Sequence, residues 1–177
     1  KTILQPDEML VDIQFNALKE NQKGTFIKLA LRRAQAISIV NVAVLLSFEG
    51  AEIKAAAITL GAVAPTIIHA IEAEAYLCGR SLTEEVMTQA AFLTMKAARP
   101  IDDIRASAVY RREMVRILTL RALRSLRNNS EKDSFPLEPI LLWGKELSTK
   151  QSFSQFDPVS NINTSINGKK YNFIGAH

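Results

Sequence analysis

The spacing of apolar residues changes along the chain, and each change predicts a different kind of element. From Met9 to Phe15 every second residue is apolar, which predicts a short strand. Pro6-Asp7-Glu8 predicts a turn just before it, and the polar run at residues 19–24 predicts a loop after it.

Residues 25–64 are rich in β-branched and other apolar side chains. Strands are predicted at 25–29 and 37–48, and a return strand at 51–64. Glu49-Gly50 separates the two longer runs and predicts a turn, so the segment is expected to form an antiparallel hairpin.

The strand predicted at 37–48 is apolar on both faces. One face carries Ile39, Ala43 and Leu45, and the other Val40, Val42, Val44 and Leu46. A strand of this kind needs cover on both sides. We expect helices to cover one face and another layer or another domain to cover the second.

Two helices are predicted in residues 66–127. Ser81-Leu82-Thr83-Glu84 matches a capping box, and Arg99-Pro100 ends the first helix. The second is expected from about Ser107 to Arg127, with Asn128-Asn129 ending it. Their apolar stripes are Val86, Ala90, Leu93 and Ala97 in the first, and Tyr110, Met114, Leu118 and Ala122 in the second.

The composition changes after residue 127, where Asn, Ser, Lys and Asp become frequent. Residues 128–160 are polar and predict a linker with one apolar patch, residues 140–144, that contains Trp143. Residues 162–173 predict a strand, an Asn-Gly turn and a second strand. The whole pattern predicts an α+β fold: an antiparallel sheet of about three to four strands with two long helices packed on one face, plus an irregular C-terminal tail.

Composition narrows the possible classes of protein. With 177 residues, 47% of them hydrophobic, the chain can form one packed domain, with or without a tail. Because Cys78 is the only cysteine, a disulfide scaffold or a site of several thiolates within these residues is excluded. The net charge of +4 is low for a nucleic-acid binder, and no apolar run reaches the length of about 18 residues that a membrane span needs.

The N-terminus lacks the basic-then-apolar order of a signal peptide. It also lacks an initiator Met, so we expect the chain to begin inside a longer protein. We expect that protein to be cytoplasmic.

Few residues suggest catalysis. His69 and His177 lie far apart, and His69 is expected to be a surface or capping residue rather than a metal ligand. Cys78 is expected to be a small buried apolar residue rather than a reactive thiol. Asp102-Asp103 could form an acid–base pair, but capping of the following helix is the commoner role.

Six arginines lie in the last helix, at positions 111, 112, 116, 121, 124 and 127. They could form a basic face for nucleic acid. A solvated face, or ion pairs to a partner subunit, is the commoner arrangement.

Lys28 stands out because it lies inside the apolar strand Phe26-Ile27-Lys28-Leu29. A lysine at such a position often extends its amine from a strand edge into water. The functional alternative is a fixed positive charge that points into a cofactor site.

Four blocks of the sequence resemble the FAD-binding (medium) subunit of the molybdenum hydroxylases, the family of xanthine dehydrogenase, CO dehydrogenase and nicotinate dehydrogenase. They are TFIKLALRRAQAISIVNVAVLL (25–46), LGAVAPT (60–66), SLTEE (81–85) and ARPIDDIRASAVYRREMVRILTLRAL (98–123). The resemblance implies that 1–23 end the FAD-binding domain and that 24–127 form the flavoprotein C-terminal domain, with 128–160 as a linker.

The resemblance also implies two cofactor contacts. In the family, an apolar residue in the strand after a PxE turn packs near the flavin, and a lysine eighteen positions later reaches it; these positions match Leu10 and Lys28. An ammonium there would stabilise the negative charge of the reduced ring. This chain departs from the family by lacking its Gly-rich FAD-binding half and by having Ile67 and His69 where Pro and Arg are usual.

The tail resembles the opening hairpin of a plant-type 2Fe-2S domain at residues 166–171, so 161–177 are expected to start such a domain. The alternatives are a generic Asn-Gly hairpin and a disordered tail. The family implies an oxidoreductase subunit that passes electrons from 2Fe-2S clusters through FAD to NAD or another acceptor. Its partners would be the molybdenum-cofactor subunit and the 2Fe-2S subunit or domain. The fragment is expected to be inactive alone.

Two other functions stay open. The chain could be a non-catalytic assembly module that holds no flavin, with the arginine-bearing helix and the Trp143 patch binding partner chains. A nucleic-acid binder ranks lowest because the charge is modest and no binding motif is present.

Overall fold

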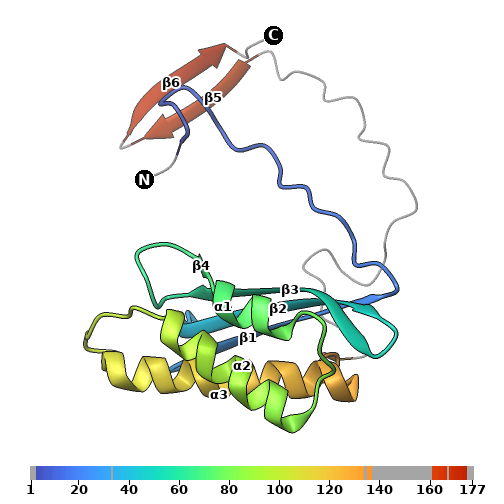
Figure 1. Cartoon of the computed structure of the whole chain (residues 1–177). Helices are drawn as coiled ribbons and strands as arrows, with labels where there is room; N and C mark the ends of the chain where they lie inside the picture. The colour runs from blue at the N-terminus through green and yellow to red at the C-terminus, as the bar shows by residue number, and fades with distance from the viewer. Residues whose placement is uncertain (1–2, 33, 134, 137–160, 167, 175–177) are drawn as a thin grey trace. The chain divides into compact units, whose positions relative to one another are not determined.

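The computed structural model describes residues 3–32, 34–133, 135–136, 161–166 and 168–174. The chain divides into two compact units, Lys1–Ser134 and Phe135–His177. The first holds one sheet and three helices, and the second holds a hairpin (Figure 1).

The sheet of the first unit has four antiparallel strands in sequential order. They are β1 (Gln22–Ala30), β2 (Ser38–Glu49), β3 (Glu52–Gly61) and the short β4 (Ile68–His69). The predicted hairpin is therefore confirmed, and Gly50 takes the positive φ of 62° that its turn requires. The predicted loop at 19–24 is shorter than expected because β1 begins at Gln22.

Three helices follow the sheet: α1 (Ile71–Leu77), α2 (Glu84–Ala97) and α3 (Ala108–Asn128). The N-cap of α2 is Thr83, whose side chain accepts from the amide of Val86, so the capping box predicted from Ser81 lies two residues too early. The start of α3 next to Ser107 agrees with the prediction, and Ser107 is its N-cap, with a side chain that accepts from the amide of Tyr110. Asn129 ends α3 in the left-handed region with φ of 54°.

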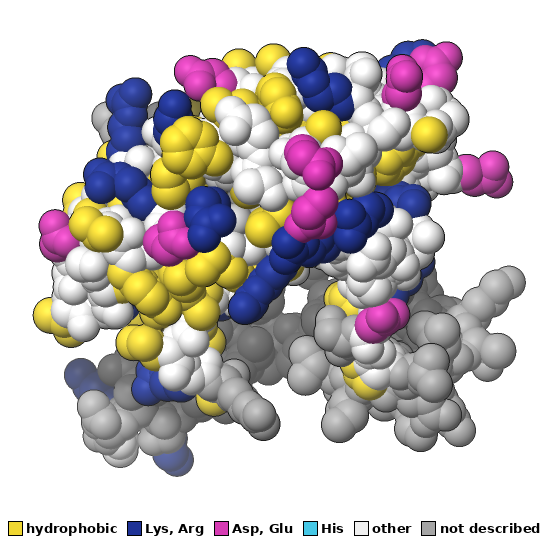
Figure 2. All heavy atoms as spheres, turned by 60° about the horizontal axis from the view of Figure 1, so that its bottom comes forward, with side chains coloured by type: hydrophobic (Ala, Val, Ile, Leu, Met, Phe, Trp, Pro, Cys, Tyr) yellow, Lys and Arg dark blue, Asp and Glu magenta, His cyan; other side chains and the backbone are white. Residues whose placement is uncertain are grey.

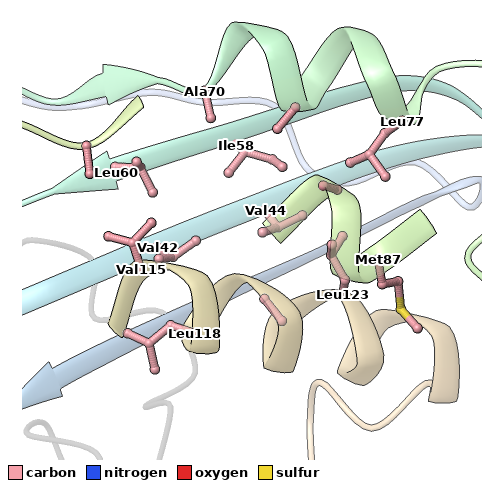
Figure 3. Close-up of a cluster of buried hydrophobic side chains, with 14 of the residues drawn as sticks. Val42, Val44, Ile58, Leu60, Ala70, Leu77, Met87, Val115, Leu118 and Leu123 are labelled. Carbon is pink, nitrogen blue, oxygen red and sulfur yellow. The ribbon is translucent and has the colours of Figure 1, made fainter. Parts of the chain in front are cut away.

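The helices cover one face of the sheet and form a single core with it. Figure 3 shows side chains of β2 and β3, such as Val42, Val44 and Ile58, gathered with Leu118 and Leu123 of α3. These side chains are buried, and burial of each contributes about 2 kcal/mol. The α+β fold with two long helices on one face is confirmed.

Within the described residues of the first unit, no helix or strand covers the opposite face of the sheet, which is called the bare face below. Along β2, Val42 and Val44 are buried, whereas Leu45 is 36% exposed and Phe26 of β1 is 61% exposed. The helices cover one face of β2 as expected, because all three pack on the same side. The expectation that another layer or another domain covers the second face stays a prediction.

The N-terminal segment does not form the strand predicted at residues 9–15. These residues have no regular secondary structure, and Met9, Val11, Ile13 and Phe15 are all exposed. Alternation alone was insufficient, because a strand also needs a neighbour that satisfies its backbone groups. The turn predicted at Pro6-Asp7 is present, since the amide of Glu8 donates to the carbonyl oxygen of Gln5 at 3.1 Å.

In the second unit, β5 (Asn161–Ile166) and β6 (Lys169–Ile174) pair antiparallel, as predicted. Gly168 lies in the turn with φ of 77°. The predicted apolar patch with Trp143 lies outside the described residues. No helix in the described part of the chain is long and apolar enough to cross a membrane.

Candidate functional site

The bare face of the sheet carries side chains in three rows that the strand register defines. Partners in an antiparallel pair point to the same side of the sheet. One row consists of Lys28, Asn41 and Gly61; the next of Phe26, Ala43, Thr59 and His69; and the third of Gly24, Leu45 and Ala57.

Three of the six residues that β2 and β3 place in these rows are alanine or glycine, which keeps this part of the face low. Ala43, Ala57 and Gly61 place little or no side chain above the backbone, and Phe26 contributes an exposed ring. A flat apolar surface of this kind suits either a planar ligand or the surface of another folded body.

Lys28 is the one residue of these rows that carries a permanent positive charge, and its side chain is exposed. Leu10, the other predicted contact, is 62% exposed and lies in the irregular N-terminal segment. The hydrogen bonds that residues 5–14 form within the described chain are local, and none of them joins this segment to Lys28.

The chain before β1 does reach the bare face at one point. A Cβ built on Gly24 would lie 3.5 Å from Cδ1 of Leu45 and 3.6 Å from Cδ1 of Leu18. Leu18 therefore lies beside Gly24 in the third row, and it is a point at which the segment before β1 contacts this face.

A separate hollow of about 490 Å³ lies between the loop after β3, β4 and the second half of α2. Thr66, Leu93, Lys96 and Arg99 are among its lining residues, and Lys28 is not. The predicted cofactor contact thus lies on an open surface rather than in this hollow.

An ion cluster built around one buried arginine supports the end of the sheet that carries the Lys28 row. Arg111 of α3 is 2% exposed and donates to the carbonyl oxygens of Ile39 and Ala62 at 3.0 Å each. It also donates to Oδ1 of Asp103 at 2.6 Å, and Arg105 donates to Oδ2 at 2.6 Å. The sequence did not distinguish Arg111 from the other arginines of α3.

Hydrogen bonds from Arg105, from backbone amides and from Arg111 hold the pKa of Asp103 far below its ordinary value. The predicted capping role fits only its neighbour: Asp102 accepts from the amide of Ala108 at 2.7 Å. Asp103 instead accepts a hydrogen bond from Arg111 of α3, and Arg111 in turn donates to the carbonyl oxygens of Ile39 and Ala62 at the end of the sheet.

Two other predictions have different outcomes. His69 lies at the surface as expected, with its Nδ1 2.8 Å from Oε1 of Glu74. Cys78 is exposed, so the prediction of a buried side chain is wrong. It follows the last residue of α1, and the next residue, Gly79, has φ of 73° and donates its amide to the carbonyl oxygen of Ile53 at 2.8 Å.

The remaining arginines of α3 include three that pair with carboxylates of this chain. Glu113 pairs with Arg116, and Glu84 of α2 pairs with both Arg124 and Arg127. Hydrogen bonds from Arg124 and then Arg127 lower the pKa of Glu84. On the face shown in Figure 2, basic side chains are mixed with acidic and apolar ones, which does not favour a nucleic-acid surface.

Fold and site together define a class: an α+β domain with helices on one face and a flat, open sheet face that bears one lysine. Residues 25–126 match the model of the CO dehydrogenase flavoprotein C-terminal domain. The chain belongs to this family, and its predicted identity as the C-terminal domain of a molybdenum hydroxylase FAD subunit is confirmed.

Known proteins show the same likeness. The chain is 29% identical over 102 residues to the glyceraldehyde dehydrogenase medium chain of Sulfolobus acidocaldarius, over 58% of this chain and 36% of that protein. The structure matches carbon monoxide dehydrogenase from Hydrogenophaga pseudoflava with a TM-score of 0.59 at 28% identity, covering 63% and 39% of the two chains. Quinoline 2-oxidoreductase from Pseudomonas putida 86 gives 0.57 at 29% identity, covering 62% and 38%.

The chain therefore spans less than two fifths of the length of these relatives. The match begins at residue 25, so it includes Lys28 and the bare sheet face but not Leu10.

Proposed function

We propose that this chain is part of the flavin-containing electron-transfer subunit of a molybdenum hydroxylase and that its bare sheet face forms one wall of the FAD site. Electrons would come from 2Fe-2S clusters and leave to NAD or another acceptor. The organic substrate would be oxidised in the partner subunit that holds the molybdenum cofactor. The observation that carries this proposal is an exposed ammonium, Lys28, on a flat sheet face in a chain of this family.

The residues of this face have the charge and the apolar surface that a flavin ring needs. FAD, when bound, accepts and releases two electrons, and its reduced ring is negatively charged. The Lys28 ammonium supplies the opposite charge, while Phe26 and the small side chains beside it supply an apolar contact surface. Lys28 would therefore stabilise the reduced form more than the oxidised form.

A wall that is open on its outer side requires a second body to complete the site. We propose that the upstream FAD-binding domain supplies it and that Leu10, at the end of that domain, packs against the ring and excludes water. The 62% exposure of Leu10 agrees with a residue whose contacts lie outside this chain.

The test uses the full-length protein, including the upstream FAD-binding half, with Lys28→Met. We expect less flavin bound per protein, measured by absorbance at about 450 nm. We also expect the reduction potential of the bound flavin to be lower than in the wild type, because a charge that stabilises the reduced ring is lost. Lys54→Met is the matched control, since Lys54 is exposed and pairs with Glu49 near the β2–β3 turn.

Equal flavin content and equal potential in the Lys28 variant and the control would contradict the assignment of Lys28. A full-length protein that purifies folded but colourless would favour the alternative, an assembly module without flavin.

A further inference from the structure

Asn41 and Gly61 share the row of Lys28, and their packing is unusual. A Cβ built on Gly61 would lie only 2.4 Å from Oδ1 of Asn41 and 2.9 Å from both Cγ and Nδ2. The amide of Asn41 thus occupies the space that any larger residue at Gly61 would need.

Gly61 is required because there is no room for a larger side chain, not because of its backbone conformation. The glycines with positive φ among the described residues are Gly50, Gly79 and Gly168, so Gly61 has a backbone that other residues adopt freely. Asn41 is fixed on its other side, where Nδ2 donates to Oγ of Ser38 at 3.1 Å. The amide is therefore held across the surface of β3 instead of extending into water.

The strand register places this amide in the same row, and on the same face of the sheet, as the Lys28 ammonium. Asn41 is the register partner of Lys28, and side chains of such partners start about 5 Å apart on the same face. Ser38 is the one hydrogen-bond partner of the amide within the described residues, which leaves Oδ1 able to accept. A donor and an acceptor in one row of the face match a ring edge on which a carbonyl oxygen adjoins an N–H.

The pyrimidine ring of a flavin has such an edge. We infer that Asn41, held in place by Gly61 and Ser38, is a second flavin contact that accepts from the ring N–H while Lys28 donates to the adjacent carbonyl oxygen. This inference rests on the proposed function and adds the residue that orients the ring.

The test is a double-mutant cycle in the full-length protein with Asn41→Ala, Gly61→Ala and the double variant. Loss of the hydrogen bond in Asn41→Ala is expected to weaken flavin binding about fivefold. Gly61→Ala is expected to give a similar loss, because its methyl group displaces the amide. The double variant is expected to bind flavin no more weakly than Asn41→Ala alone, since no amide remains to be displaced.

Asn41→Asp gives a second readout that a purely structural role would not change. A carboxylate beside the ring opposes reduction, so the potential of the bound flavin is expected to fall. Asn128→Asp, at the exposed end of α3, is the control and should leave the potential unchanged. Thermal unfolding of each variant establishes that it is folded.

The outcomes separate the two ideas. If Lys28→Met changes the potential but Asn41→Asp does not, or if the two alanine substitutions weaken binding additively, the role of Asn41 is overturned and the proposed function stands. If neither Lys28→Met nor Asn41→Asp changes the flavin, the role of Asn41 is overturned, and so is the part of the proposed function that makes the bare sheet face a wall of the FAD site.

Discussion

The guanidinium of Arg111 illustrates how one side chain can join three parts of the fold. It donates to a carbonyl oxygen at the start of β2, to another just after β3, and to Asp103 ahead of α3. Because this guanidinium is buried, its positive charge depends on the carboxylate of Asp103 for compensation. Loss of that negative charge is expected to loosen the sheet end beside Lys28.

Asp103 should therefore make stability depend on pH in acid. Its pKa in the folded chain lies below the ordinary value of 3.8. A carboxyl group with a lowered folded pKa contributes stability above its unfolded pKa, and this contribution is lost as the pH falls through the folded pKa. We expect stability to decline below about pH 4 and expect Asp103→Asn to be less stable at neutral pH, with a shallower decline in acid.

Urea unfolding between neutral pH and pH 2.5 measures this dependence. Glu52→Gln removes an exposed carboxylate that forms no ion pair among the described residues, and it serves as the control. An Asp103→Asn variant with the same acid slope as the wild type would contradict the assignment.

At the scale of elements, β2 divides the molecule into a packed side and an open side. Its alternate residues point to the helices and to the bare face, so neighbours in sequence have different environments. Val44 and Leu45 form such a pair, the first 2% and the second 36% exposed.

This difference predicts unequal effects of the same substitution. Val44→Ser puts a hydroxyl and a small void into the core and is expected to lower the free energy of unfolding by about 3 kcal/mol. Leu45→Ser is expected to lower it by less than about 1 kcal/mol. Chemical denaturation of this chain measures both values, and equal losses would show that the second face is also packed.

The elements could be predicted from sequence where local signals agree with packing. Gly50 and the apolar runs beside it predicted the β2–β3 hairpin, and Ser107 with Asn129 bounded α3. The strand predicted at residues 9–15 failed because its alternation had no partner strand within the described chain to pair with.

At the scale of the whole molecule, the packed core lies within one unit. Its buried apolar residues extend from Ile39 to Leu126, inside the segment 25–126 that matches the family. The second unit, Phe135–His177, contributes none of the described core residues.

A chain that ends after Ser134 is therefore expected to keep the thermal midpoint of the complete chain, because no described core contact is removed. Circular dichroism at 222 nm during heating measures this midpoint. A truncated chain that melts several degrees lower would show that the tail stabilises the first unit.

The candidate site was only partly predictable from sequence. Lys28 could be found because it interrupts an apolar strand and because of the family resemblance. Asn41 and Gly61 lie twenty residues apart, and only the register of β2 against β3 brings them together. Arg111 was missed because its helix position alone does not indicate that the chain after β3 closes over it.

The open sheet face has a kinetic consequence under the proposed function. A flat ring caught between this face and a second domain has no exit through either body, so its escape requires the two to separate. The rate at which bound flavin exchanges with free flavin would then report how often that interface opens. Mutations far from the ring that weaken the interface would speed this exchange without touching the ring itself.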